Sequence, residues 1–189
     1  MDVGTVQGMP ITYTAELSGA AEDPSNASPG TGFATVIFDD IAHTLSVDVS
    51  FSGLIGITTA AHIHCCTSAP ETGTASVATA TPSFPGFPAG VTSGSYTNLF
   101  DLTLSSSFNP FFITANGNTP GAEAALGAGL AGGLAYFNIH TQTFTGGEIR
   151  GFLRPVPEPD TFSLLSLGIV SLLVAKLKRR DGQAAAQNC

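Results

Sequence analysis

The chain has 189 residues, of which 43% are hydrophobic and only 11% charged, and its formal net charge is −8 at pH 7. Residues 1 to 160 hold two cations, Arg150 and Arg154, against thirteen carboxylates, which gives this part a formal charge of −11. So acidic a surface repels phosphate backbones and has no basic stripe, which excludes a nucleic-acid partner. The roughly 155 residues before the C-terminal segment suffice for a single domain with a buried core.

Residues 1–10 form an N-terminal lead. The stretch from Met1 to Thr5 has neither a basic region nor an apolar core, so it is not a secretory signal peptide.

Alternation of apolar and polar residues with period two, typical of half-buried strands, recurs from residue 11 to residue 153. It is clearest over residues 43–51, where Leu45, Val47 and Val49 share one face and Ser46 and Asp48 share the other. Strands are predicted at 11–17, 32–38, 43–51, 58–64, 75–79, 96–104, 133–140 and 147–153. The residues at 39–42 suit the turn of a hairpin between the second and third of these strands.

Two further segments interrupt the strand pattern. Residues 81–90 contain three prolines, which predicts a surface loop pinned to the domain by Phe84 and Phe87. Thr119 as N-cap and Pro120 at the first helical position predict one short helix, which Gly127 and the following glycines would end. The expected fold is all-β: an antiparallel, Greek-key-like β-sandwich of about eight strands with one short helix, plus a C-terminal transmembrane helix.

Two histidine-bearing strands are the main candidates for chemistry. Period two places His62 and His64 on one face of a strand, and Asn138 and His140 on one face of another. If these strands are neighbours, His62, His64 and His140 form a three-histidine site suited to zinc or copper, with Glu148 as a further partner. The alternative is a structural network in which the histidines bond to backbone or carboxylate groups and Asn138 completes the set.

The closing segment of the domain carries Glu148, Arg150 and Gly151. Glu148 and Arg150 are predicted to lie on one face and to tie the last strand to its neighbour, while Gly151 permits a close backbone approach. The sequence has no Ser-His-Asp order, nucleophile elbow, Walker loop or dinucleotide fingerprint. We therefore assign no catalytic residue and expect no enzyme and no obligatory cofactor.

The motifs around these residues resemble the CHRD domain, named after chordin, over residues 11–154. The resemblance is carried by His-Ile-His at 62–64, Tyr-Phe-Asn-Ile-His-Thr at 136–141 and Gly-Glu-Ile-Arg-Gly at 147–151. It implies a β-rich, exported domain with a binding or structural function. By analogy with chordin, which is a secreted antagonist of a protein ligand, a protein partner is one expectation.

The C-terminal segment has three parts in a fixed order. A linker at 155–161 contains Pro157, Glu158 and Pro159; an apolar segment follows at 162–177; and a basic tail at 178–189 completes it. As a helix, residues 162–175 would span about 21 Å, short of the roughly 30 Å of a bilayer core unless the side chain of Lys176 reaches the headgroups. The basic cluster of Lys176, Lys178, Arg179 and Arg180 would hold the C-terminus in the cytoplasm.

This order resembles the PEP-CTERM sorting signal of Gram-negative bacteria. The resemblance implies an exosortase-like processing protease, an inner-membrane anchor with the domain facing the periplasm, and later release to the cell surface or medium. It also implies an extracellular polysaccharide as a candidate neighbour. Because residues 1–10 hold no export signal, two explanations stay open: a signal lost from the start, or a chain that never leaves the cytoplasm.

Cysteine usage gives no disulfide framework. Cys65 and Cys66 are adjacent, and a bond between them requires a strained ring, so two small buried or half-buried thiols are the favoured interpretation. The expected function is that of an exported, non-catalytic envelope or matrix protein. The alternative is a metal-binding or metal-dependent redox domain built on the three histidines.

Overall fold

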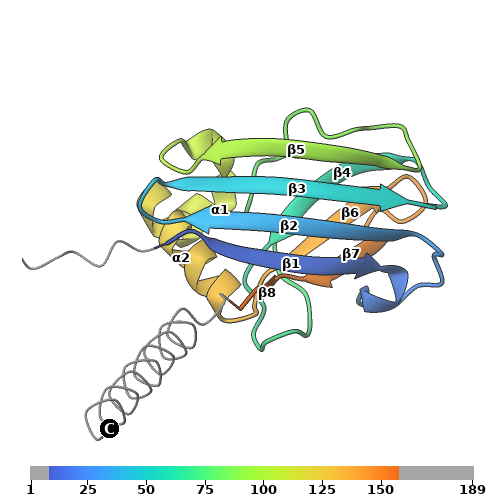
Figure 1. Cartoon of the computed structure of the whole chain (residues 1–189), viewed down its shortest axis with the longest axis horizontal. Helices are drawn as coiled ribbons and strands as arrows, with labels where there is room; N and C mark the ends of the chain where they lie inside the picture. Colours follow the sequence, from blue (N-terminus) through green and yellow to red (C-terminus); the bar gives the residue numbers. More distant parts are fainter. Residues whose placement is uncertain (1–8, 158–189) are drawn as a thin grey trace, which may run out of the picture. The chain divides into compact units, whose positions relative to one another are not determined.

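One antiparallel sheet dominates residues 9–157, the part of the chain that the computed structural model describes (Figure 1). Its strands are β1 (Ile11–Ser18), β2 (Thr31–Asp39), β3 (Thr44–Ser52), β4 (Thr58–His64), β5 (Gly94–Asp101), β6 (Tyr136–Thr141), β7 (Ile149–Phe152) and β8 (Arg154–Pro155). The mostly-β, antiparallel class expected from the alternation is confirmed.

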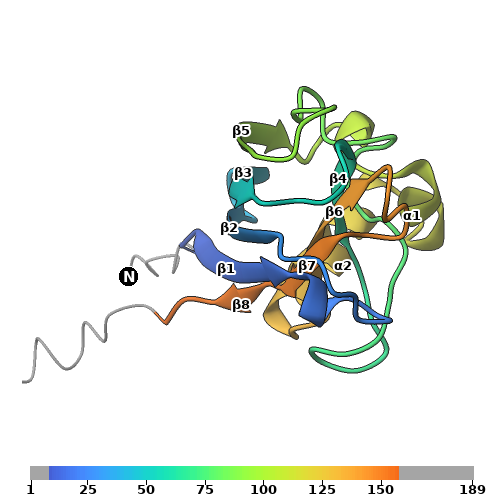
Figure 2. The ribbon, with the colours of Figure 1, turned by 90° about the vertical axis from the view of Figure 1, so that its right-hand side faces the viewer.

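The sheet curls so that its two halves face each other like the layers of a sandwich. The strand order is β4-β6-β7-β1-β2-β3-β5, and β8 pairs with β1 beside this path. Figure 2 shows β1, β2, β3 and β5 on one side and β4, β6 and β7 on the other. The halves join where β1 meets β7, a pairing that consists of Ser18 opposite Arg150.

The predicted hairpin is formed by β2 and β3. All nine residues of β2 pair with β3, from Thr31 opposite Ser52 to Asp39 opposite Thr44. In the turn, the Asp39 carboxylate accepts hydrogen bonds from the backbone N–H groups of Ile41 (2.9 Å) and Ala42 (2.8 Å). A short polar side chain thus closes the turn, as this residue type is expected to do.

The hydrophobic core fills the space between the two halves. Leu45, Val47 and Val49 of β3 are fully buried, and so are Ile63 of β4 and Phe137 of β6. The proline-rich segment 81–90 contributes as predicted, because Phe84 and Phe87 are 2% and 8% exposed. The centre of the Phe84 ring lies 5.1 Å from the centre of the Phe100 ring and 5.8 Å from that of Phe137, so this loop closes one end of the core.

The described residues contain two α-helices where one was predicted. Both α1 (Pro110–Ala115) and α2 (Thr119–Ala131) lie near the end of the sheet where β2 turns into β3 (Figure 1). In α1, which was not predicted, Asn109 is the N-cap and its side chain accepts from the Phe111 N–H.

Helix α2 differs from the prediction at both ends. Its N-cap is Asn118, whose side chain accepts from the Gly121 N–H at 2.8 Å, so Thr119 is the first helical residue. The helix also continues through Gly127 and Gly129 to a cap at Gly132. These two glycines do not end the helix because they allow close packing: a Cβ at Gly127 would collide with the Phe38 ring.

Two other strand predictions need correction. Residues 75–79 form only isolated bridges, between His64 and Val77 and between Thr79 and Phe108, so this segment is a loop running beside the free edge of β4. Strand β5 ends at Asp101, because the Asp101 carboxylate accepts from the Thr103 N–H and hydroxyl and turns the chain there.

The segments expected to anchor the chain lie outside the described residues. This holds for the segment 162–177, the basic tail 178–189, and Glu158 and Pro159 of the sorting motif. Within residues 9–157 no helix has the length and apolarity needed to cross a membrane. The described residues up to Val156 belong to one compact unit.

Candidate metal centre

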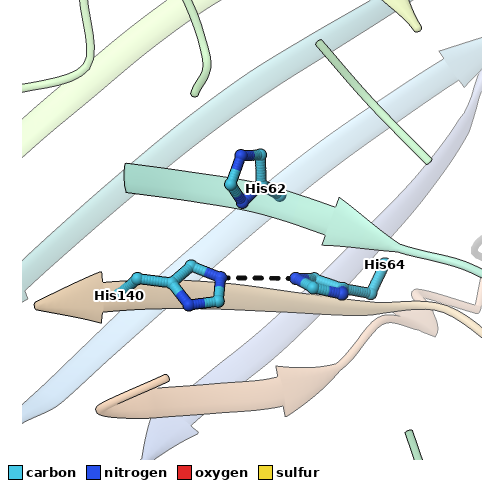
Figure 3. Close-up of side chains that lie close together, drawn as sticks. All are labelled: His62, His64 and His140. Atoms are coloured by element: carbon cyan, nitrogen blue, oxygen red, sulfur yellow. Dashed lines mark hydrogen bonds between the residues drawn. The ribbon is translucent and has the colours of Figure 1, made fainter. Parts of the chain in front are cut away.

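Strands β4 and β6 bring the three predicted histidines together. In their antiparallel register His62 lies opposite Asn138, His64 opposite Tyr136, and Ala60 opposite His140. Because side chains alternate along a strand, the three histidines share one face, while Ile63 and Phe137 point into the core from the other. Figure 3 shows His62 and His64 on β4 turned toward His140 on β6.

The spacing of the ring nitrogens suits a small cation. One nitrogen from each of His62, His64 and His140 lies within 4.8 Å of the other two. The Nε2 atoms of His64 and His140 are 3.4 Å apart. Tetrahedral zinc with Zn–N bonds of about 2.0–2.1 Å requires neighbouring nitrogens about 3.3–3.4 Å apart. The His64–His140 edge therefore already has the length of a coordination edge.

The backbone fixes the tautomer of each ring. His62 Nε2 lies 2.8 Å from the Pro82 carbonyl, His64 Nδ1 lies 2.9 Å from the Ala75 carbonyl, and His140 Nδ1 lies 3.0 Å from the Thr145 carbonyl. A carbonyl oxygen can only accept, so each of these nitrogens carries the proton and donates it. The other nitrogen of each ring is left with a lone pair.

These lone pairs converge without a proton donor. His62 Nδ1 is buried and has no hydrogen-bond partner. His64 Nε2 and His140 Nε2 face each other as two acceptors, which repel unless a cation or a proton lies between them. The predicted structural network is thus half correct. One nitrogen of each ring is bonded to a backbone carbonyl, while the other nitrogen, which faces the cluster, has no hydrogen-bond donor.

Burial keeps the rings neutral. It lowers the pKa of His62 and of His64 to about 4, and it lowers the pKa of His140 as well. The neighbouring Arg150 guanidinium further lowers the pKa of His64. A proton therefore does not fill the gap between the rings at neutral pH, and neutral imidazole is the form that binds transition metals.

Access to the cluster is from the side of His140. His62 and His64 are 6% and 8% exposed, whereas His140 is half-buried. The segment that supplies the Ala75 and Pro82 carbonyls covers the other two rings. Three nitrogen ligands with one accessible side form the ligand set of a zinc or copper site that keeps an open position.

Glu148 lies elsewhere, contrary to the prediction that it supports the histidines. Its fully buried carboxylate accepts from the Ser28 and Thr141 hydroxyls, both at 2.7 Å, and from the N–H groups of Ile55 and Gly56. Burial alone would raise the pKa of Glu148, but these four hydrogen bonds outweigh it and lower that pKa. The residue precedes β7 and ties it to the loop after β3.

Arg150 and Gly151 both lie in β7. Arg150 does not contact Glu148: it donates to the carbonyls of Ala21 (2.6 Å) and Gly73 (3.1 Å), and its guanidinium lies 4.7 Å from the centre of the Tyr136 ring. The predicted pair thus ties the strand to its surroundings through separate partners. Gly151 makes the close approach expected of it, because a Cβ there would collide with the Glu16 carbonyl.

A buried acid next to Asn138 was missed by sequence reasoning. Glu22 is 9% exposed and lies 4.0 Å from Arg150. Burial raises the pKa of Glu22 to about 7, although Arg150 and Asn138 act in the opposite direction. Glu22 Oε1 and Asn138 Oδ1 are both buried without a partner, and Asn138 Nδ2 reaches Gly146 instead of a histidine. No sequence motif marks Glu22. It directly follows the 3-10 helix Gly19–Ala21, which places it in the buried space next to Asn138.

Cys65 and Cys66 form a disulfide directly after β4, so the prediction of two free thiols is wrong. The bond packs against Gly129 of α2, where a Cβ would collide with both sulfurs. Only at a glycine can the helix approach the disulfide so closely. The bond thus accounts for Gly129 within α2 and removes both thiols as metal ligands.

Comparison with known proteins identifies the family. The model of the CHRD domain family matches residues 13–153, which include all three histidines. No curated protein and no solved structure matches the chain. A match over most of the chain is sufficient for assignment, so the chain belongs to the CHRD domain family.

Proposed function

We propose that this CHRD domain binds one transition-metal ion, zinc or copper, through His62, His64 and His140. The observation that carries the proposal is the convergence of three imidazole lone pairs with no donor between them. Buried acceptors are rarely left unsatisfied. A metal ion satisfies all three together, and the outer hydrogen bonds already hold the rings in the required tautomers.

The competing interpretation is a purely structural histidine cluster. In that case the protein would hold no metal, and loss of any one histidine would weaken folding by removing its bond to the backbone. The metal proposal predicts instead that the metal-free protein is destabilised by the repulsion between lone pairs and gains stability when an ion binds.

Metal content distinguishes the two interpretations. The chain is produced without a histidine tag, exposed to zinc or copper, freed of excess ion, and measured by mass spectrometry. We expect close to one equivalent in the parent and none in a variant carrying both His62→Ala and His64→Ala. The matched control is His43→Ala, because His43 lies outside the cluster and bonds to Glu123. A parent without metal refutes the proposal.

We further propose that the domain works outside the cytoplasm as a non-catalytic binding or structural protein. The support is the order of Pro157, Glu158 and Pro159, the apolar segment 162–177 and the basic tail 178–189. The Cys65–Cys66 disulfide adds to it, because disulfides persist in oxidising compartments. The chain would be anchored in the inner membrane facing the periplasm, cut by an exosortase-like protease, and passed to the cell surface or medium, near an extracellular polysaccharide or a protein ligand.

Fractionation tests the second proposal. A full-length chain with a secretory signal added at its start is followed in a bacterium that has an exosortase. We expect a shortened form in the envelope or medium, and the full-length form when Pro157 and Pro159 are both replaced by alanine. An uncut parent that stays in the cytoplasm contradicts the proposal.

A further inference from the structure

Tyr136 lies directly beside the histidine cluster without offering it a ligand atom. It is the first residue of β6, pairs with His64 across the two strands, and is 2% exposed. Its ring stacks on the His64 imidazole, with ring centres 4.8 Å apart and an angle of 7° between the planes. The Arg150 guanidinium lies 4.7 Å from the centre of the Tyr136 ring.

The Tyr136 hydroxyl holds the backbone of Ala75, the residue that fixes His64. It donates to the Ala75 carbonyl at 3.2 Å and accepts from the Ala75 N–H at 3.2 Å. The same carbonyl accepts the proton of His64 Nδ1 at 2.9 Å. The carbonyl oxygen of Ala75 thus accepts two hydrogen bonds, one from each side chain, and uses both of its lone pairs.

Ala75 needs such an anchor because its segment lacks regular pairing. Residues 73–76 belong to no strand, and the nearest ladder contacts are the isolated bridge between His64 and Val77 and the bond from Cys65 N–H to the Ser76 carbonyl. Without the hydroxyl, the N–H and the carbonyl of Ala75 would each lose a bond to Tyr136. The carbonyl that accepts the His64 proton would then be held only by that bond and by the bond from the Cys65 N–H to the next carbonyl, that of Ser76.

We infer that Tyr136 is the positioning residue of the metal centre: it holds the His64 ring, and through Ala75 its tautomer, so that Nε2 is presented to the ion. This inference rests on the proposed metal function. Removing a partner that orients a metal-binding histidine typically costs about 10- to 100-fold in metal affinity.

Tyr136→Phe is the decisive variant, since it keeps the ring and its stacking and deletes only the hydroxyl. Tyr96→Phe is the matched control. Tyr96 is also buried, and its hydroxyl likewise donates to a carbonyl, that of Pro85, and accepts an N–H, here from the side-chain amide of Asn98, both at 3.0 Å. Its aromatic neighbours are Phe84 and Phe87 in the core.

Two measurements on the whole chain test the inference. Zinc titration should give a Kd about 10- to 100-fold weaker for Tyr136→Phe and within about twofold of the parent for Tyr96→Phe. In the metal-free proteins, nitrogen-15 NMR of the imidazole rings should show His64 as a single Nδ1–H tautomer in the parent and in Tyr96→Phe, and as a tautomer mixture in Tyr136→Phe.

Each outcome decides between the alternatives. An unchanged tautomer in Tyr136→Phe, an unchanged Kd, or an equal loss of affinity in both variants overturns the role of Tyr136. A parent that binds no zinc and no copper refutes the metal function itself, while the tautomer measurement still shows whether Tyr136 sets the state of His64. Circular dichroism on both variants confirms that they are folded.

Discussion

Glu148→Gln should destabilise the domain more than any other isosteric change of a carboxylate in its described part. The two carboxylate oxygens of Glu148 accept four hydrogen bonds, from Ser28, Ile55, Gly56 and Thr141. Glutamine has one oxygen and one amide NH₂. Each carboxylate oxygen accepts one backbone N–H and one hydroxyl, so the N–H at the replaced oxygen would face a donor, while the hydroxyl there would have to turn and accept from the NH₂. Hydrogen bonds to a charged group contribute about 1.5–3 kcal/mol each. The loss of two, offset by about 1 kcal/mol for the new bond of the hydroxyl, predicts a decrease of about 2–5 kcal/mol in the free energy of unfolding.

Urea unfolding at pH 7 measures this decrease. The control is Asp48→Asn, because Asp48 is exposed and its side chain accepts from the Thr97 hydroxyl alone. That substitution should change the free energy of unfolding by less than about 0.5 kcal/mol. Because the pKa of Glu148 is lowered in the folded state, its contribution is present above its unfolded pKa of about 4.3 and is lost as the pH falls through the folded pKa. A decrease below about 1 kcal/mol for Glu148→Gln would refute the assigned role.

Two further predictions concern stability. Glu22 has a pKa raised to about 7, so its ionisation should lower the free energy of unfolding of the parent by about 2–4 kcal/mol as the pH rises from about 4.5 to 8. Glu22→Gln should abolish that loss. Parallel pH profiles of stability for the parent and the variant would contradict the burial argument. Gly129→Ala should destabilise by about 1–3 kcal/mol despite alanine's higher helix propensity, because its Cβ would collide with the Cys65–Cys66 disulfide. In the same thermal-unfolding assay Gly146→Ala should be neutral, since a Cβ there meets nothing within 4 Å.

The strands and the shared face of the histidines can be predicted because both depend on a local period. Alternation fixes which residues of a strand point the same way, and this alone places His62 with His64 and Leu45 with Val47. That β4 and β6 are neighbours does not follow from periodicity. The strand order shows that they are, and so brings His140 to the other two histidines.

The partners of the polar residues could not be predicted because they come from irregular segments. The motif around Glu148 suggests a role beside the histidines, but its donors lie at residues 28, 55–56 and 141. The carbonyls that fix the imidazole rings belong to residues 75, 82 and 145, none of which lies in a strand. Loops of this kind have no period, so sequence patterns do not show where they fold back.

The glycines of α2 mislead for a related reason. A cluster of glycines usually signals the end of a helix, and the sequence predicts an end at Gly127 on that basis. Here Gly127 and Gly129 instead allow the helix to approach Phe38 and the Cys65–Cys66 disulfide. Such contacts are tertiary, and the disulfide itself was not expected, so the glycines predicted a helix end where the helix continues.

X-ray absorption spectroscopy of the zinc-loaded protein tests the central claim most directly, because it identifies the atoms bound to the ion. The three-histidine site predicts three imidazole nitrogens at about 2.0–2.1 Å, with any remaining ligand a light atom such as water oxygen. The same spectrum of Tyr136→Phe should show the same ligands at lower occupancy. A sulfur ligand at about 2.3 Å, or a shell without imidazole scattering, would contradict the account and place the ion elsewhere.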